Sequence, residues 1–127
     1  MVKILVAEDE KDIRELISFS LKYSGFEVIT AVDGQEAVEK AMEARPDLIM
    51  MDVRMPRMTG YEACARLKEI EELKDTPVVI LSAKGQESEI QTGLNVGAYE
   101  YILKPFAPDE LIQRVKRIVR GLSAKTT

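Results

Sequence analysis

Residues 47–56 have the sequence DLIMMDVRMP, in which an apolar run ends at Asp52 and a loop containing Pro56 follows at once. A continuous apolar run of this length is typical of a strand buried on both faces of a parallel sheet. The carboxylate of Asp52 is therefore expected at the carboxyl end of the strand, where open parallel sheets bind their ligands.

Four further β-rich runs are spaced along the chain and alternate with amphipathic stretches. This alternation predicts right-handed βαβ units on one parallel sheet, and hence an α/β fold. The strands are expected at residues 3–7, 27–31, 47–51, 78–82 and 99–103.

The stretches between the strands carry helix signals. Thr59 and Glu62 have the spacing of a capping box, and Asp33 with Glu36 is a weaker version. Pro108 suits the first position of the last helix. The apolar stripe of that helix is formed by Leu111, Ile112, Val115, Ile118, Val119 and Leu122.

Composition limits the possible functions. The 127 residues fit one domain, expected at 1–121, with a polar tail or linker stub at 122–127. A net charge of −4 argues against a general nucleic-acid surface, and no apolar run could span a membrane.

The first strand begins too early for a signal peptide, and the single cysteine, Cys64, indicates a reducing compartment, the cytoplasm. There is no histidine, which excludes histidine-based catalysis and a phosphohistidine on this chain.

Polar or charged side chains suited to binding or catalysis also lie at the ends of three of the other four strands. The acidic run 8–10 follows the first strand, Ser82 ends the fourth, and Lys104 with Pro105 follows the fifth. Because the carboxyl ends of parallel strands meet at one edge of a sheet, these groups are expected to gather near Asp52. Three clustered carboxylates repel one another, so the cluster indicates a Mg²⁺ site with hard oxygen ligands.

These residues resemble the receiver domain of bacterial two-component response regulators over essentially all of residues 3–121. The resemblance rests on four pieces in the right order: ILVAEDE at 4–10, DLIMMDVRMP at 47–56 with Gly60, LSA at 81–83, and GA at 97–98 leading to KPF at 104–106. It implies a doubly wound, flavodoxin-like fold with five parallel strands in the order 2-1-3-4-5 and five helices.

The resemblance also implies the chemistry. Asp52 would accept a phosphoryl group from a partner histidine kinase or phosphotransfer protein, so the domain would be a phosphoacceptor regulator rather than a classical enzyme. Asp9 and Asp52 would hold Mg²⁺, with Glu8 joining through a water and Arg54 through its backbone carbonyl. Glu8 stands where aspartate is more usual. Lys104 would bind a phosphoryl oxygen, and Ser82 would donate a hydrogen bond.

Further roles follow from the same resemblance. Ser82 and Tyr101 would form the switch, and the output partner would bind helix four, strand five and helix five. Arg54 and Lys84 would tune the rates of phosphorylation and dephosphorylation. The nonfunctional alternatives are a turn-forming Asp52, Ser82 as a helix cap, and Lys104 as an ordinary surface lysine.

Two other functions compete with this interpretation. A phosphate-insensitive pseudo-receiver would need neither the acids nor the lysine, and all of them are present. An aspartate-nucleophile phosphohydrolase would carry a second Asp two residues after the nucleophile, where this chain has Arg54. Nucleotide or flavin binding is disfavoured because no glycine-rich phosphate loop follows the first strand.

Overall fold

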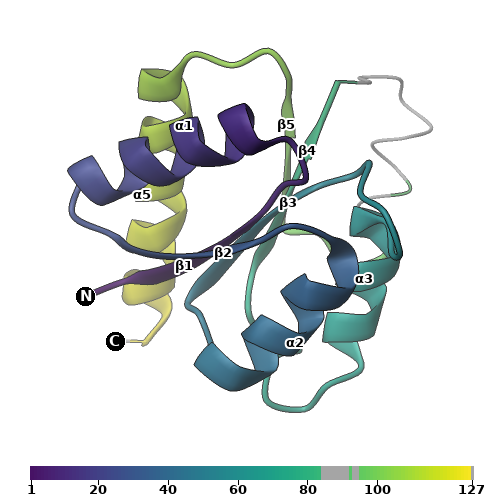
Figure 1. The fold of residues 1–127 in the computed structure, drawn as a ribbon. Coiled ribbons are helices and arrows are strands. Elements are labelled where there is room, and N and C mark those ends of the chain that lie inside the picture. Colours follow the sequence, from purple (N-terminus) through teal and green to yellow (C-terminus); the bar gives the residue numbers. More distant parts are fainter. Residues whose placement is uncertain (84–91, 93–94, 127) are drawn as a thin grey trace.

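The computed structural model of the chain describes residues 1–83, 92 and 95–126. They form one parallel sheet with the strand order β2-β1-β3-β4-β5, as Figure 1 shows. The strands are β1 (Lys3–Ala7), β2 (Glu27–Ala31), β3 (Leu48–Asp52), β4 (Val78–Ser82) and β5 (Glu100–Leu103). The predicted sheet and its strand order are confirmed.

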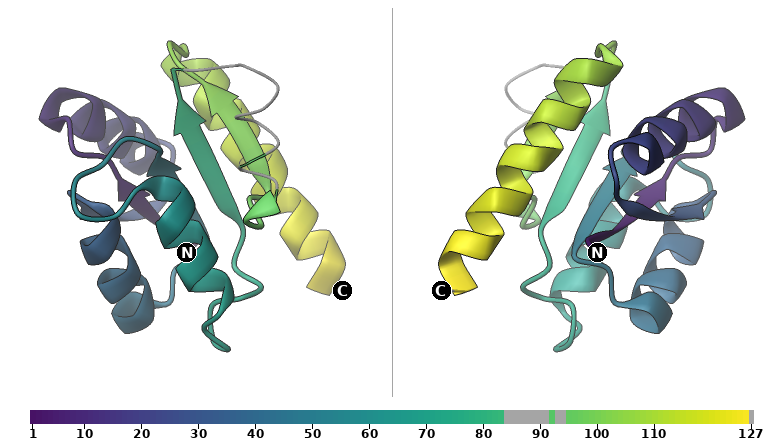
Figure 2. Two further views of the ribbon diagram at one scale, coloured as in Figure 1. Left: turned by 90° about the vertical axis from the view of Figure 1, so that its right-hand side faces the viewer. Right: turned by 90° about the vertical axis from the view of Figure 1, so that its left-hand side faces the viewer.

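Helices cover both faces of this sheet. They are α1 (Lys11–Tyr23), α2 (Gly34–Ala44), α3 (Gly60–Lys68) and α5 (Pro108–Thr126). α1 and α5 lie on one face and α2 and α3 on the other, with α5 running along β4 and β5 (Figure 2). The described residues thus hold four helices, not the five predicted. The remaining helix that the resemblance implied was expected between β4 and β5, where residues 84–91 and 93–94 lie outside the described part of the chain.

The core has two layers, one on each face of the sheet. Alternate residues of a strand point to opposite faces, so Leu5 and Ile49 pack on the α2–α3 side while Ile4 and Leu48 pack on the α1–α5 side. Every residue of β3 and β4 is buried. This confirms that the central strands are covered on both faces, as their continuous apolar sequences predict.

Three strand boundaries differ by one residue from the prediction: β3 begins at Leu48 instead of Asp47, and its end and the start of β5 also move. Asp52 is the last residue of β3 rather than the first after it, because it pairs with Leu81. The Val53 N–H then donates to the Leu81 carbonyl at 3.1 Å. β5 begins at Glu100 instead of Tyr99. The site aspartate is therefore fixed by the sheet itself.

The predicted helix starts are confirmed. Thr59 and Glu62 form a reciprocal capping box at α3, and the Asp33 side chain accepts the Glu36 N–H at α2. α5 begins at Pro108 and continues to Thr126. The boundary between the domain and its tail, predicted after residue 121, is not tested by the course of this helix and stays a prediction. Among the described residues, no helix combines the length and the apolar character that crossing a bilayer requires.

Candidate phosphoacceptor and metal site

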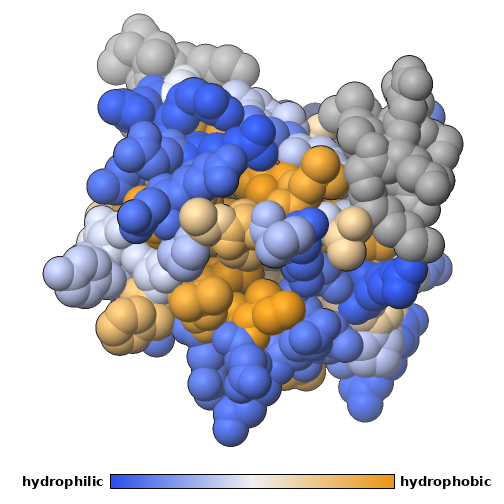
Figure 3. All heavy atoms as spheres, turned by 90° about the horizontal axis from the view of Figure 1, so that it is seen from above, coloured by the Kyte–Doolittle hydropathy of each residue, from blue (hydrophilic) through white to orange (hydrophobic). Residues whose placement is uncertain are grey.

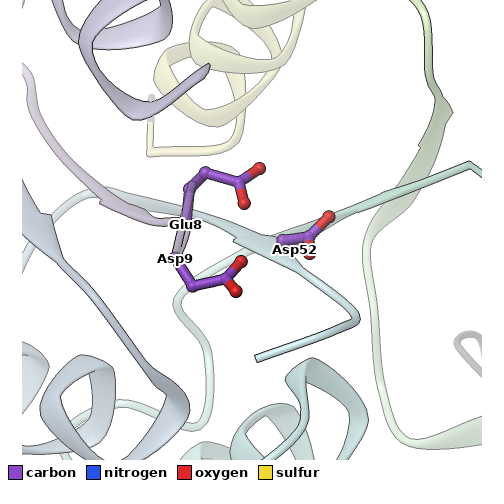
Figure 4. Close-up of side chains that lie close together, drawn as sticks. All are labelled: Glu8, Asp9 and Asp52. Atoms are coloured by element: carbon purple, nitrogen blue, oxygen red, sulfur yellow. The ribbon is translucent and has the colours of Figure 1, made fainter. Parts of the chain in front are cut away.

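Three carboxylates meet at the carboxyl ends of β1 and β3. Glu8 and Asp9 directly follow β1, Asp52 ends β3, and these two strands are neighbours in the sheet. One oxygen from each carboxylate lies within 4.8 Å of the other two. Figure 4 shows the three side chains close together. The predicted acid cluster is therefore present in three dimensions.

The ammonium group of Lys104 lies between two of these acids. Its Nζ is 2.7 Å from Glu8 Oε1 and 2.7 Å from Asp52 Oδ1. All three side chains are largely buried, and Glu8 has no exposed surface at all. Charge-assisted hydrogen bonds of this length are strong, particularly away from water. Lys104 thus offsets part of the negative charge of the cluster.

Burial and charge act on the protonation of this pair in opposite directions. Burial is the largest influence on Glu8 and raises its pKa, with a further upward contribution from the charge of Asp52, while Lys104 opposes the shift. Burial also disfavours the charged form of Lys104, but the hydrogen bonds and charges of Asp52 and Glu8 outweigh it and raise the pKa of Lys104. Lys104 therefore stays an ammonium at neutral pH.

Backbone groups fix the positions of the carboxylates. The Arg54 N–H donates to Asp52 Oδ2 at 3.1 Å, and the Glu10 N–H donates to Glu8 Oε2 at 3.3 Å. Arg14, in the first turns of α1, donates through Nη1 to the Glu8 carbonyl at 2.9 Å. These bonds hold both acid-bearing loops against the sheet.

Gly60 allows the chain to turn back tightly over Asp52. Its N–H donates to the Val53 carbonyl at 2.9 Å, which closes the loop of residues 53–59. A Cβ at this position would lie closer than 3.0 Å to the carbonyl oxygen of Asp52, a separation that real Cβ atoms do not show. Only glycine fits here without moving the end of β3 or the start of α3.

The cluster suits a small divalent cation. Mg²⁺ prefers oxygen ligands about 2.0–2.1 Å away, so opposite ligands are roughly 4.2 Å apart. Neighbouring ligands of the same octahedron lie roughly 2.9 Å apart. The oxygens of Glu8, Asp9 and Asp52 all lie within 4.8 Å of one another, so one cation would be within reach of all three, directly or through a bound water. Asp9 is exposed, which leaves an open side for water or a phosphoryl group.

The structure places the other predicted residues around this cluster. Ser82 is buried at the end of β4, and its carbonyl accepts the Lys104 N–H at 2.7 Å, so the two residues are neighbours. The Lys104–Pro105 bond is cis. Arg54 is exposed beside Asp52, whereas Lys84 lies outside the described residues.

Tyr101 lies on β5, farther from the acids. It is half-buried, and its hydroxyl is 3.4 Å from the hydroxyl of Tyr61 on α3. A switch role was predicted for Tyr101 from the sequence, and none for Tyr61. No local sequence pattern links Tyr61 to a residue 40 positions away.

Two other features of the site were missed. Lys104 was assigned to a phosphoryl oxygen, and its ion pair with Glu8, 96 residues earlier, was not anticipated. Arg14 was not considered either, although an arginine six residues after Glu8 can reach back from the first turns of a helix to its carbonyl.

The sequence matches the family model of the response regulator receiver domain over residues 4–116. Among similar proteins is the alkaline phosphatase synthesis transcriptional regulatory protein PhoP of Bacillus subtilis, 44% identical over 118 residues, which are 93% of this chain and 48% of the relative. Another is the phosphate regulon transcriptional regulatory protein PhoB of Escherichia coli, 42% identical over 121 residues, which are 95% of this chain and 53% of the relative. The chain thus spans about half the length of these relatives.

A solved structure gives the same result for the whole fold. The chemotaxis response regulator CheY4 of Vibrio cholerae superposes with a TM-score of 0.89 and 39% sequence identity, covering 93% of this chain and 98% of that one.

Proposed function

The chain belongs to the response regulator receiver family and is thus a phosphoacceptor of two-component signalling, and we propose that Asp52 is the residue that accepts the phosphoryl group. One observation carries this proposal: the Asp52 carboxylate ends a buried strand while Lys104 and two further acids converge on it. Phosphoryl transfer needs alignment and charge neutralisation more than covalent chemistry from the protein, and this arrangement supplies both.

The reaction is a displacement at phosphorus. A carboxylate oxygen of Asp52 forms a bond to the phosphorus, the bond from phosphorus to the donor atom breaks, and the leaving group takes the electron pair and a proton from water. The product is an acyl phosphate. Since the chain contains no histidine, a phosphohistidine donor must belong to another molecule, a histidine kinase or a phosphotransfer protein.

Mg²⁺ bound at the acids would neutralise charge on the transferring oxygens. Asp9 and Asp52 would be direct ligands, Glu8 would contribute through a water, and Arg54 would contribute its backbone carbonyl. Once Glu8 and Asp52 have another positive charge beside them, the Lys104 ammonium can turn to a phosphoryl oxygen. The Ser82 hydroxyl would donate to a second oxygen.

The donor partner has an apolar surface available next to the site. Leu16 is 47% exposed and Phe19 70% exposed on the outer side of α1. Leu16 also lines an apolar hollow that includes Phe106 and reaches Lys104. Viewed from above, apolar surface gathers in the middle of a hydrophilic rim (Figure 3). This surface suits a partner helix that brings its phosphohistidine to Asp52.

The switch would run from Ser82 to Tyr101 on the neighbouring strand. Phosphorylation would draw the Ser82 hydroxyl toward the new oxygens and allow Tyr101 to repack. The output partner would then read the predicted face of helix four, β5 and α5, of which β5 and α5 lie in the described part of the chain. Glu100 already joins β5 to α5 through Arg114 at 3.6 Å and Arg117 at 3.3 Å. The relatives named above are transcriptional regulatory proteins, so control of transcription is a candidate output.

The chemistry can be tested with a small acyl-phosphate donor, with intact mass as the readout. Wild type should gain one phosphoryl group with Mg²⁺ and none with a chelator, and Asp52→Ala should gain none under either condition. Wild type that stays unmodified with both the small donor and a kinase would favour the pseudo-receiver alternative.

The partner surface needs a different experiment. Phe19→Ser should slow phosphotransfer from a histidine kinase while leaving the rate with the small donor unchanged, because only the kinase has to dock. Equal slowing with both donors would mean that Phe19 supports the site itself rather than a docking surface.

A further inference from the structure

The loop between β3 and α3, residues 53–59, packs closely against the start of α2. A Cβ at Gly34 would lie closer than 3.0 Å to the carbonyl oxygen, carbonyl carbon and Cβ of Met58. Gly34 is the first residue of α2, so the loop touches the helix at its N-terminus. The loop that follows Asp52 is therefore in direct contact with the start of α2, which has no proposed role in phosphoryl transfer.

An ion pair closes this contact. Arg57 Nη1 lies 3.3 Å from Asp33 Oδ2, while Asp33 Oδ1 accepts the Glu36 N–H at 2.7 Å. The Asp33 side chain is only 4% exposed, whereas that of Arg57 is 72% exposed. The carboxylate is thus rigidly held by α2, and the arginine reaches to it from the loop.

Arg57 holds this position in an unusual backbone conformation. Its φ of 69° is in the left-handed region, which residues other than glycine seldom adopt and which persists where the surroundings enforce it. The adjacent Met58 N–H donates to the Pro56 carbonyl at 2.7 Å. The ion pair to Asp33, together with the close approach of Met58 to Gly34, ties this tightly turned part of the loop to α2.

The other end of the same loop belongs to the phosphoacceptor site. Arg54 donates its N–H to Asp52 Oδ2 and is the residue whose carbonyl is proposed to face the cation. Only residues 55 and 56 separate it from Arg57. The Gly60 N–H donates to the Val53 carbonyl, so the two ends of the loop are joined. A displacement of Arg57 would therefore shift Arg54, which lies between Val53 and Arg57.

We propose that Asp33 and Arg57 form a positioning pair that holds the β3–α3 loop in the geometry needed for the Arg54 backbone to serve the cation and Asp52. The inference rests on the proposed function, because it deals with the same Mg²⁺ site. A backbone ligand is effective only when its segment is already ordered, since otherwise binding must supply the ordering entropy. Neither residue touches the reacting atoms, so their role is to position others.

Mg²⁺ titration of Arg57→Gln by calorimetry separates this role from simple electrostatics. Removing a positive charge near a cation site should by itself tighten Mg²⁺ binding. Loss of the positioning pair should instead weaken it, by about threefold, equivalent to ~0.6 kcal/mol and within the range of partly exposed ion pairs. Arg57→Lys keeps the ion pair and should bind like wild type. Lys74→Gln removes the same charge from the exposed pair with Glu71 and is the matched control.

A second readout needs no cation. Hydrogen exchange of the backbone amides, measured without Mg²⁺, should speed up in Arg57→Gln at Arg54, Met58 and Gly60 and stay unchanged in β1 and α5. Asp33→Asn should do the same while retaining the cap of α2, because asparagine also caps helices well.

The outcomes distinguish the metal site from the positioning pair. Wild type that fails to bind Mg²⁺ would overturn the proposed metal site, while local exchange in the variants would still decide on the positioning pair. Unchanged or tighter Mg²⁺ binding by Arg57→Gln in a wild type that does bind would overturn the positioning pair. Uniformly faster exchange throughout the molecule would also overturn it, since that result shows a loss of global stability only.

Discussion

Replacing Lys104 with methionine tests the electrostatics of the site most severely. The substitution keeps the length of the side chain but removes the ammonium that lies 2.7 Å from both Glu8 and Asp52. Glu8, which has no exposed surface, then keeps a buried charge without its partner. Breaking a buried ion pair typically costs about 3–5 kcal/mol.

The expected loss of stability is somewhat smaller here. Asp52 retains the Arg54 N–H, and the site opens to solvent beside exposed Asp9, so we expect about 2–3 kcal/mol at neutral pH without Mg²⁺. For a domain of this size that is a fall in Tm of roughly 10 °C. Lys74→Met, which breaks an exposed pair with Glu71, is the matched control and should lose ~0.5 kcal/mol or less.

Two conditions should restore the Lys104→Met variant. Mg²⁺ supplies positive charge to the same carboxylates, so it should raise the Tm of the variant more than that of wild type. Acid should also help. Burial already raises the pKa of Glu8 above its unfolded value. Lys104 lowers this pKa, so removing Lys104 raises it further. A carboxyl with a raised folded pKa binds more protons in the native state, so stability increases as pH falls through that pKa toward the lower pKa of the unfolded chain.

Thermal unfolding followed by circular dichroism measures all of these effects. A variant that melts within about 2 °C of wild type at pH 7 without Mg²⁺ would show that Lys104 does not offset the charge of the acids.

The remaining predictions concern other parts of the molecule. Gly60→Ala should lose about 2 kcal/mol or more in denaturant unfolding, because the new Cβ would press on the Asp52 carbonyl; stability equal to wild type would contradict the close contact. Arg54→Asn should lose its phosphoryl group faster than wild type, as followed by intact mass, because a cation that hinders attacking water is gone; an unchanged half-life would remove Arg54 from rate control. Native Cys64 should react with iodoacetamide far more slowly than the unfolded chain up to pH 8.5, because burial raises the thiol pKa and Sγ donates to the Val96 carbonyl; equal rates would contradict its burial.

Much of the fold could be predicted because its signals are local. The apolar runs mark each strand, and the capping box at Thr59 and Glu62 marks the start of α3. Parallel topology then brings strand ends together, so the placement of Asp52, Asp9 and Lys104 in one site follows from their positions at those ends. Their placement was predictable for this reason, and their roles remain to be measured.

Long-range contacts could not be predicted in the same way. The sequence shows Glu8 and Lys104 as separate residues 96 positions apart, and only the packed site decides which carboxylate the ammonium meets. The pair of Asp33 with Arg57 is similar, because it depends on a left-handed residue in a loop that has no repeating pattern. The end of β3 was misplaced by one residue because strand pairing with Leu81, not hydrophobicity, extends it to Asp52.

The central claim is that Asp52 carries the phosphoryl group, and its direct test is to locate the modification. The protein is phosphorylated with a small acyl-phosphate donor and Mg²⁺, treated with borohydride, which reduces an aspartyl phosphate to homoserine, and sequenced by tandem mass spectrometry. Homoserine at position 52, absent when a chelator replaces Mg²⁺, is the predicted result. Homoserine at position 9 or at any other aspartate, with position 52 unmodified, would contradict the account.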